Sequence, residues 1–203
     1  MGTHIEVCTQ TPLEIGIVLD TSWSIQEQDF NTSKTFLENF LQKFNLGSGT
    51  EGVRVSIITY DKAIYPKDGF NLTSYHSKQD VLDAVRHIPH RKGMATITWE
   101  GIKYMQKVQL AKDVVRPWAQ KISVVLTDGN SQRPDWTEQA AKAARKDGII
   151  IFAIGVGSGV REEELLNISG DESRVFKVDN YDQLDSILDV LVNKTCISEF
   201  SLR

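Results

Sequence analysis

The 203-residue chain has only two cysteines, no long apolar run and no excess of basic residues. No segment approaches the roughly 18 apolar residues that a membrane-spanning helix needs, so we expect a soluble chain without direct membrane insertion. The net charge of −4 gives no electrostatic footprint for a polyanion, so we expect no nucleic-acid partner. The remaining composition is that of a globular protein, and the length predicts one domain.

The two cysteines, Cys8 and Cys196, lie near opposite ends of the sequence. Because the termini of compact α/β domains often lie close together, we predict a Cys8–Cys196 disulfide, which would contribute roughly 4 to 5 kcal/mol in the chain-entropy model. Two unrelated free thiols are the alternative. Acceptor triplets for N-glycosylation begin at Asn31, Asn71, Asn167 and Asn193. Together these features favour a secreted or extracellular-matrix protein, or the ectodomain of a membrane protein.

Apolar periodicity predicts strands that alternate with helices along almost the whole chain. This order is typical of an α/β fold: a doubly wound, mostly parallel sheet with one antiparallel edge strand and helices on both faces, as in Rossmann-like proteins. The expected strands are 14–19, 53–59, a short pair at 63–65 and 70–72 around a turn, 122–126, 149–154 and 175–178. The expected helices are 26–44, 77–87 (capped by Ser77), 99–114, 135–147, 162–167 and 181–193.

We expect a single domain over residues 13–195, as one domain of a longer chain. Residues 1–12 would be an N-terminal extension or tag remnant that carries Cys8, and residues 196–203 a C-terminal extension.

Small oxygen donors follow two of the predicted parallel strands. Asp20, Ser22 and Ser24 alternate within "GIVLDTSWSIQ", Asp128 follows "VVLT", and Thr96 lies in the loop "GMATITWEG". The carboxyl ends of parallel strands form the binding crevice of such sheets. Oxygen donors without histidine or cysteine suit Mg²⁺, with Mn²⁺ or Ca²⁺ as competitors. The alternative is that Asp20 caps the next helix and the serines form a turn.

These motifs, "DTSWS" at 20–24, Thr96 and "LTDG" at 126–129, resemble the von Willebrand factor type A domain, a family that includes the inserted domain of integrins. The resemblance covers residues 13–195. It implies a metal-ion-dependent adhesion site (MIDAS) in which Ser22, Ser24 and Thr96 offer hydroxyl oxygens to the metal. Asp20 and Asp128 would act through waters or by orienting the hydroxyls. An acidic residue of a protein partner would complete the coordination. The resemblance to integrins further implies a closing helix that slides along the domain when ligand binds; if Cys196 is bridged to Cys8, we predict that the helix 181–193 cannot move far and that ligand affinity is nearly fixed.

Trp23 lies within the first site motif, and Trp99 and Trp136 follow the second and third. Trp23 stands where family members commonly carry a small residue, so it either contacts the ligand or folds back onto the domain. Trp99 and Trp136 would extend this aromatic rim. His76, His87 and His90, together with Arg91 and Lys92, are expected to form a solvated basic edge.

The resemblance favours a non-catalytic extracellular adhesion module that binds a carboxylate of collagen, another matrix protein or a receptor. A metal-dependent phosphatase-like enzyme is one alternative, although the position two residues after Asp20 is Ser22 and not a second acid. A structural matrix domain with incidental metal binding is another. "GVGSG" at 155–159 is no dinucleotide fingerprint, because Val160 stands where the third glycine is needed; it predicts a turn with positive φ.

Overall fold

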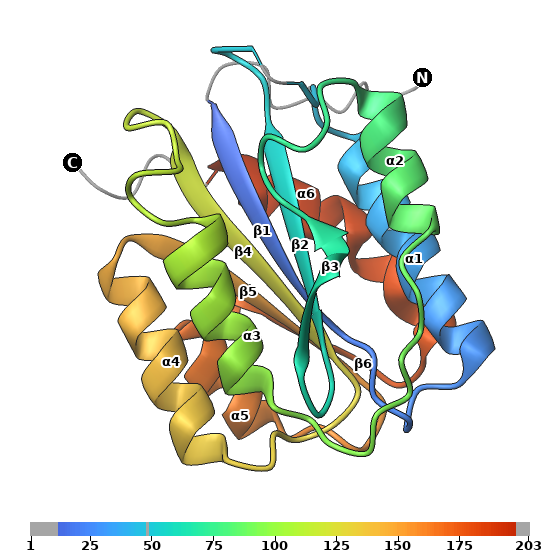
Figure 1. Ribbon diagram of the computed structural model, residues 1–203. Coiled ribbons are helices and arrows are strands. Elements are labelled where there is room, and N and C mark those ends of the chain that lie inside the picture. The colour runs from blue at the N-terminus through green and yellow to red at the C-terminus, as the bar shows by residue number, and fades with distance from the viewer. Residues whose placement is uncertain (1–11, 48, 198–203) are drawn as a thin grey trace.

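A six-stranded sheet forms the centre of the computed structural model, which describes residues 12–47 and 49–197 (Figure 1). The strand order is β3-β2-β1-β4-β5-β6, and every pairing is parallel except that of β2 with β3. This arrangement confirms the predicted fold class. The strands are β1 (Leu13–Asp20), β2 (Arg54–Tyr60), β3 (Ile64–Phe70), β4 (Gln120–Thr127), β5 (Ile149–Val156) and β6 (Val175–Val178).

Helices cover both faces of this sheet and make two cores. In β1 all eight residues are buried, and alternate side chains enter opposite cores: Ile17 and Leu19 pack on one face, Val18 on the other. One face is covered by α1 (Glu27–Gln42), α2 (Lys78–Arg86) and α6 (Leu188–Ile197). The other is covered by α3 (Thr98–Tyr104), α4 (Pro134–Lys146) and α5 (Glu162–Ser169).

The predicted pair of short strands at 63–65 and 70–72 is wrong, because β3 runs without a turn from Ile64 to Phe70. Pro66 is tolerated there because β3 is an edge strand, where a missing N–H need not break a ladder. The register between β2 and β3 shifts between Ile57 and Thr59.

The predicted helix 99–114 is also shorter than expected. It begins as α3 and continues as a π-helical turn, η1 (Met105–Gln109), in which Leu110 N donates to Met105 O at 2.7 Å. The buried Gln109 amide donates to Ile57 O at 2.9 Å and Phe70 O at 3.3 Å, beside the irregular β2–β3 pairing. These tertiary hydrogen bonds favour the wider turn over a continued α-helix.

The closing segment differs from the single helix predicted over 181–193. It begins as a 3₁₀ helix, η3 (Tyr181–Ile187), and continues as α6, which contains Cys196. Cys8 lies outside the described residues, so the Cys8–Cys196 bridge and its effect on helix travel stay predictions. A short 3₁₀ turn, η2 (Glu172–Arg174), precedes β6.

Local backbone features test several smaller predictions. The Ser77 hydroxyl accepts a hydrogen bond from Asp80 N at 3.2 Å, which confirms it as the cap of α2. Asp20 does not cap α1, since Gln26 holds the N-cap position. Gly157 has φ +79°, as predicted for the "GVGSG" turn. No helix among the described residues is long and apolar enough to cross a membrane.

Candidate metal site at the carboxyl edge of the sheet

Asp20 is the last residue of β1 and is fully buried. Its Oδ1 accepts from Ser22 N at 2.9 Å, and its Oδ2 accepts from the Thr127 hydroxyl, at the end of β4, at 2.7 Å. Among the described residues, no lysine, arginine or histidine pairs with this carboxylate. Burial therefore raises the pKa of Asp20 to about 7 against the opposing effect of its hydrogen bonds.

Two serines connect this region to Asp128. The Ser22 and Ser24 hydroxyls are 3.1 Å apart, and the Ser24 hydroxyl donates to Asp128 Oδ1 at 2.9 Å. Burial also raises the pKa of Asp128 above its ordinary value. Hydrogen bonds thus bring together Asp20, Ser22, Ser24 and Asp128, which come from the ends of two adjacent parallel strands.

Thr96 lies in the loop before α3, and its hydroxyl has no hydrogen-bond partner within the part of the chain that is described. The loop itself is fixed by Asp61, a fully buried residue just after β2. Asp61 Oδ2 accepts from Gly93 N at 2.8 Å, and its carbonyl accepts from Ile97 N at 3.0 Å. Asp61 thus fixes both ends of the segment that carries Thr96. A side chain at Gly93 would meet the Asp61 carboxylate at 2.3 Å, so this close approach requires glycine.

Asp61 was not predicted as a site residue, although an acid directly after a buried strand, in "IITYD", is the same signal that identified Asp20. Glu164 in α5 was not predicted either; it is 4% exposed and accepts from Ser131 N at 2.8 Å. This contact ties the loop after Asp128 to α5. Burial raises the pKa of Glu164.

The prediction that His90 belongs to a solvated edge is wrong. Its side chain is 1% exposed and stacks on Phe30, with ring centroids 4.5 Å apart. His90 Nε2 lies 3.2 Å from Ser22 O, which as a carbonyl can only accept. The His90 ring therefore fixes the backbone at Ser22. The residue before it is also fixed, because the Thr21 hydroxyl accepts from Arg91 N at 2.8 Å.

The three tryptophans differ in exposure. Trp23 is 64% exposed. Its backbone N–H donates to Gly93 O at 3.0 Å, so Trp23 lies next to the loop that carries the exposed Met94. Trp99 is 7% exposed and packs in the core against the edge of Trp136, so the expectation that it lines the rim is wrong. Trp136 remains partly exposed, with the Arg133 guanidinium 3.9 Å from its ring centroid.

A model of the von Willebrand factor type A domain matches residues 14–190. The chain belongs to this family. Among its relatives, the human collagen alpha-6(VI) chain is 30% identical over 94% of this chain and 8% of its own length. The Xenopus laevis collagen alpha-1(XXI) chain is 34% identical over 93% of this chain and 19% of its own length. The chain therefore spans less than a fifth of these collagens.

Solved type A structures include proximal thread matrix protein 1 from the mussel byssus, with a TM-score of 0.84 and 28% identity over 93% of this chain and 47% of that chain. A second structure of the same mussel protein has a zinc-occupied MIDAS motif; it is 27% identical, with a TM-score of 0.84 over 93% of this chain and 46% of that one.

The donor set of this type A domain fits a hard cation. Within the described residues, no group of three or more histidine, cysteine, aspartate or glutamate side chains gathers as a metal cluster. What gathers at the carboxyl edge of the sheet is two carboxylates and two serine hydroxyls, all oxygen donors, with a third hydroxyl on the adjacent Thr96 loop. Such a set suits Mg²⁺, Mn²⁺ or Ca²⁺.

Proposed function

We propose that this type A domain is a non-catalytic adhesion or matrix-binding module that holds a divalent ion and binds a carboxylate of a protein partner. Asp20, Ser22, Ser24, Thr96 and Asp128 would hold the ion. The observation that carries the proposal is the hydrogen-bonded set from Asp20 to Asp128, in which two acids lack a cationic partner among the described residues.

The charge balance supports an ion that retains room for an outside anion. Two buried or half-buried carboxylates without a cation are costly, and a bound divalent ion would offset that cost. With neutral hydroxyls as the remaining ligands, the ion would stay able to attract a further carboxylate. Mg²⁺ is the ion we propose, with Mn²⁺ or Ca²⁺ as competitors; the zinc in the mussel relative supports divalent binding in general.

The relatives support a matrix setting, since they are collagen chains and a byssal thread matrix protein. We therefore propose an extracellular location and a matrix protein or receptor as partner. The exposed Trp23 and Met94 would contact an apolar group of the ligand next to its acid. The acceptor asparagines Asn31, Asn71 and Asn193 are exposed and Asn167 is half-buried, so glycosylation is proposed first for the exposed three.

A phosphatase reaction receives less support from the site. A nucleophilic carboxylate needs a second group that acts as acid and a cation that binds phosphate. No described lysine or arginine hydrogen bonds to Asp20 or Asp128, and Ser22 is engaged with Ser24. We therefore propose that the domain is not an enzyme.

The test is binding of the domain to a panel of matrix proteins, including collagens, measured with magnesium and with a chelator. Asp128→Ala is compared with Asp113→Ala, an exposed acid in the loop at the other end of the sheet. We expect binding to at least one matrix protein that the chelator and Asp128→Ala abolish, while Asp113→Ala leaves it unchanged.

Carboxylate recognition is tested with a peptide from the bound protein and its Glu→Gln or Asp→Asn counterpart. Loss of binding by the amide peptide is the expected result. Binding that survives both the chelator and Asp128→Ala would contradict the proposal and favour a structural matrix domain whose metal is incidental.

A further inference from the structure

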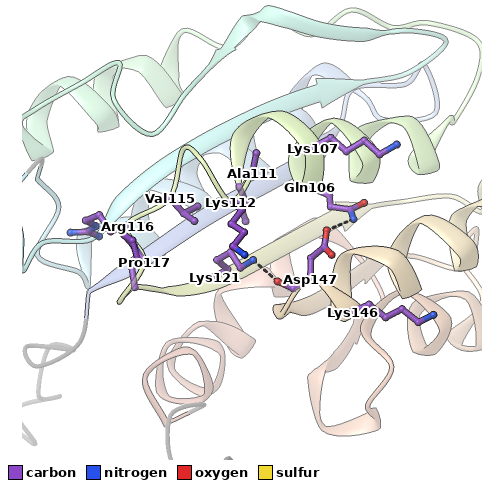
Figure 2. Close-up of a pocket in the computed structure, with 12 residues that line it drawn as sticks. Gln106, Lys107, Ala111, Lys112, Val115, Arg116, Pro117, Lys121, Lys146 and Asp147 are labelled. Carbon is purple, nitrogen blue, oxygen red and sulfur yellow. Dashed lines mark hydrogen bonds between the residues drawn. The ribbon is translucent and has the colours of Figure 1, made fainter.

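A lysine-lined cavity of about 620 Å³ lies at the opposite end of the sheet from the metal site (Figure 2). Its walls are η1, the loop between η1 and β4, the start of β4, and the end of α4. It falls within the size range of small-molecule pockets, about 300 to 1,000 Å³. The residues that line it are Gln106, Lys107, Leu110, Ala111, Lys112, Val115, Arg116, Pro117, Ala119, Lys121, Lys146 and Asp147.

The cavity and the metal site are far apart. Lys121 stands at the start of β4, whereas Asp128 follows its end. At about 3.3 Å per residue along a strand, the two lie roughly 20 Å from each other. One ligand in the cavity and another at the metal site could therefore be bound at the same time.

The described residues leave an excess of positive charge at the cavity. Lys107, Lys112 and Lys146 have no ion-pair partner among the described residues, and Lys121 donates to the Asp147 carbonyl. Figure 2 shows Lys107 and Lys146 extending toward the same side, on either side of the Gln106–Asp147 hydrogen bond of 2.6 Å. Asp147 is the one acid among the lining residues.

Two further observations indicate a ligand with both donor groups and an apolar face. Gln106 is one of the lining residues and is 8% exposed; its Nε2 donates to Asp147, but its buried Oε1 has no hydrogen-bond partner among the described residues. A buried acceptor without a donor costs free energy, which a ligand hydroxyl would recover. Trp118 stands in the same loop, between the lining residues Pro117 and Ala119, and its flat apolar side chain is 61% exposed.

We propose that this cavity binds a sulfated glycan, with sulfate groups near the lysines, a sugar hydroxyl donating to Gln106 Oε1 and a sugar ring against Trp118. A sulfated glycan combines anionic groups, hydroxyl donors and apolar ring faces, whereas an inorganic anion has no apolar face that could pack against Trp118. The net charge of −4 of the whole chain indicates no polyanion partner. Binding of an anion, however, depends on the local electrostatic field, and four lysines line this one cavity.

The experiment measures binding of a heparin-derived tetrasaccharide by calorimetry at about 0.15 M salt, where exposed charges more than about 8 Å apart are screened. Lys112→Ala/Lys146→Ala should weaken binding about tenfold, the effect of removing two exposed charge contacts. Trp118→Ala should weaken it as well. The matched control, Lys67→Ala/Lys177→Ala, removes the same charge from exposed positions on β3 and β6 and should change affinity less than twofold.

Three comparisons make the result specific. A chelator and Asp128→Ala should leave tetrasaccharide binding unchanged, which separates this cavity from the metal site. The desulfated tetrasaccharide should not bind, and inorganic sulfate should compete poorly. Equal losses in the two lysine pairs, dependence on the metal, or tighter binding of an acidic peptide than of the glycan would overturn the proposal.

Discussion

A fully buried carboxylate stands at each end of β1, and the two differ in whether a cationic side chain pairs with them. Glu14, near the start of β1, is fully buried and accepts from Arg54 Nε at 2.8 Å and from Arg116 Nε at 2.8 Å. Asp20, at the end of the same strand, is equally buried but accepts only from a serine N–H and a threonine hydroxyl. The arginines neutralise Glu14, whereas nothing in the described residues neutralises Asp20.

This difference separates a structural ion cluster from a binding site. Breaking a buried ion pair is costly, so Glu14 and its arginines stabilise one end of the domain permanently. An acid without a cation has a pKa raised by burial and gains most from a cation that arrives from solution. We therefore expect the carboxyl end of the sheet to respond to pH and to metal, and the amino end not to respond to metal.

The largest expected effect is on stability as a function of pH. The folded-state pKa of Asp20 is raised from 3.8 to about 7, so between these values the folded protein keeps a proton that the unfolded chain has released. The free energy of unfolding without metal should therefore fall as pH rises from about 4 to 7, by up to about 4 kcal/mol, and remain low above that.

Urea unfolding of metal-free wild type and Asp20→Asn across pH 4 to 8 measures this contribution as a difference. Asp20→Asn should be the more stable of the two above pH 7, and the gap should vanish near pH 4. Saturating magnesium should restore the wild type at neutral pH. Parallel pH profiles for the two proteins would show that Asp20 has an ordinary pKa and needs no cation.

The next largest effect is expected at the opposite end of the sheet. Glu14→Gln should lower the free energy of unfolding by about 3 kcal/mol, because two arginines lose their buried partner. The loss should be the same with magnesium and with chelator. Glu100→Gln is the matched control, since its ion pair with Lys103 is exposed and should contribute less than about 1 kcal/mol. A magnesium-dependent loss in Glu14→Gln would remove the distinction between the two ends.

Asp61→Asn should weaken magnesium binding about 10- to 100-fold, the usual effect of removing a group that orients metal ligands. Its carboxylate holds Gly93 N and so positions the loop of Thr96. Asp68→Asn is the control: it removes an acid on β3 that pairs with Arg91, and the magnesium affinity should not change. Calorimetric titration of both variants decides whether the Thr96 loop contributes to the site.

The smallest expected effect concerns the ligand alone. Trp23→Ala should weaken binding of the matrix partner about tenfold while magnesium affinity stays the same. Trp136→Ala should have a smaller effect, because its ring is engaged by Trp99 and Arg133. A larger loss of affinity in Trp136→Ala than in Trp23→Ala would show that the partner binds nearer to α4 than to Trp23.

Much of this picture was accessible from the sequence because it depends on local patterns. The buried apolar run of β1, the acid at its end and the acid after β4 were enough to predict a parallel sheet with oxygen donors at its carboxyl edge. Metal binding itself stays a prediction.

What the sequence did not reveal depends on tertiary contacts. The residues that follow His90 in the sequence are charged, but its ring stacks on Phe30. Trp99 follows a site motif, but its side chain packs in the core. The π-helical turn exists because Gln109 reaches carbonyls beside an irregular strand pairing that no periodicity predicts. Asp61 could have been predicted by the same rule as Asp20, since both follow a buried apolar run. Its role could not, because that role depends on its hydrogen bond with Gly93 N, which is distant in sequence.

The most direct test of the central claim is a calorimetric magnesium titration at pH 6.5 in two buffers with different ionisation enthalpies. We expect saturable binding of one ion, accompanied by proton release because Asp20, with a pKa of about 7, must ionise. Asp128→Ala should lack this binding. Absence of heat in the wild type, or an identical titration for Asp128→Ala, would show that these residues do not hold a divalent ion.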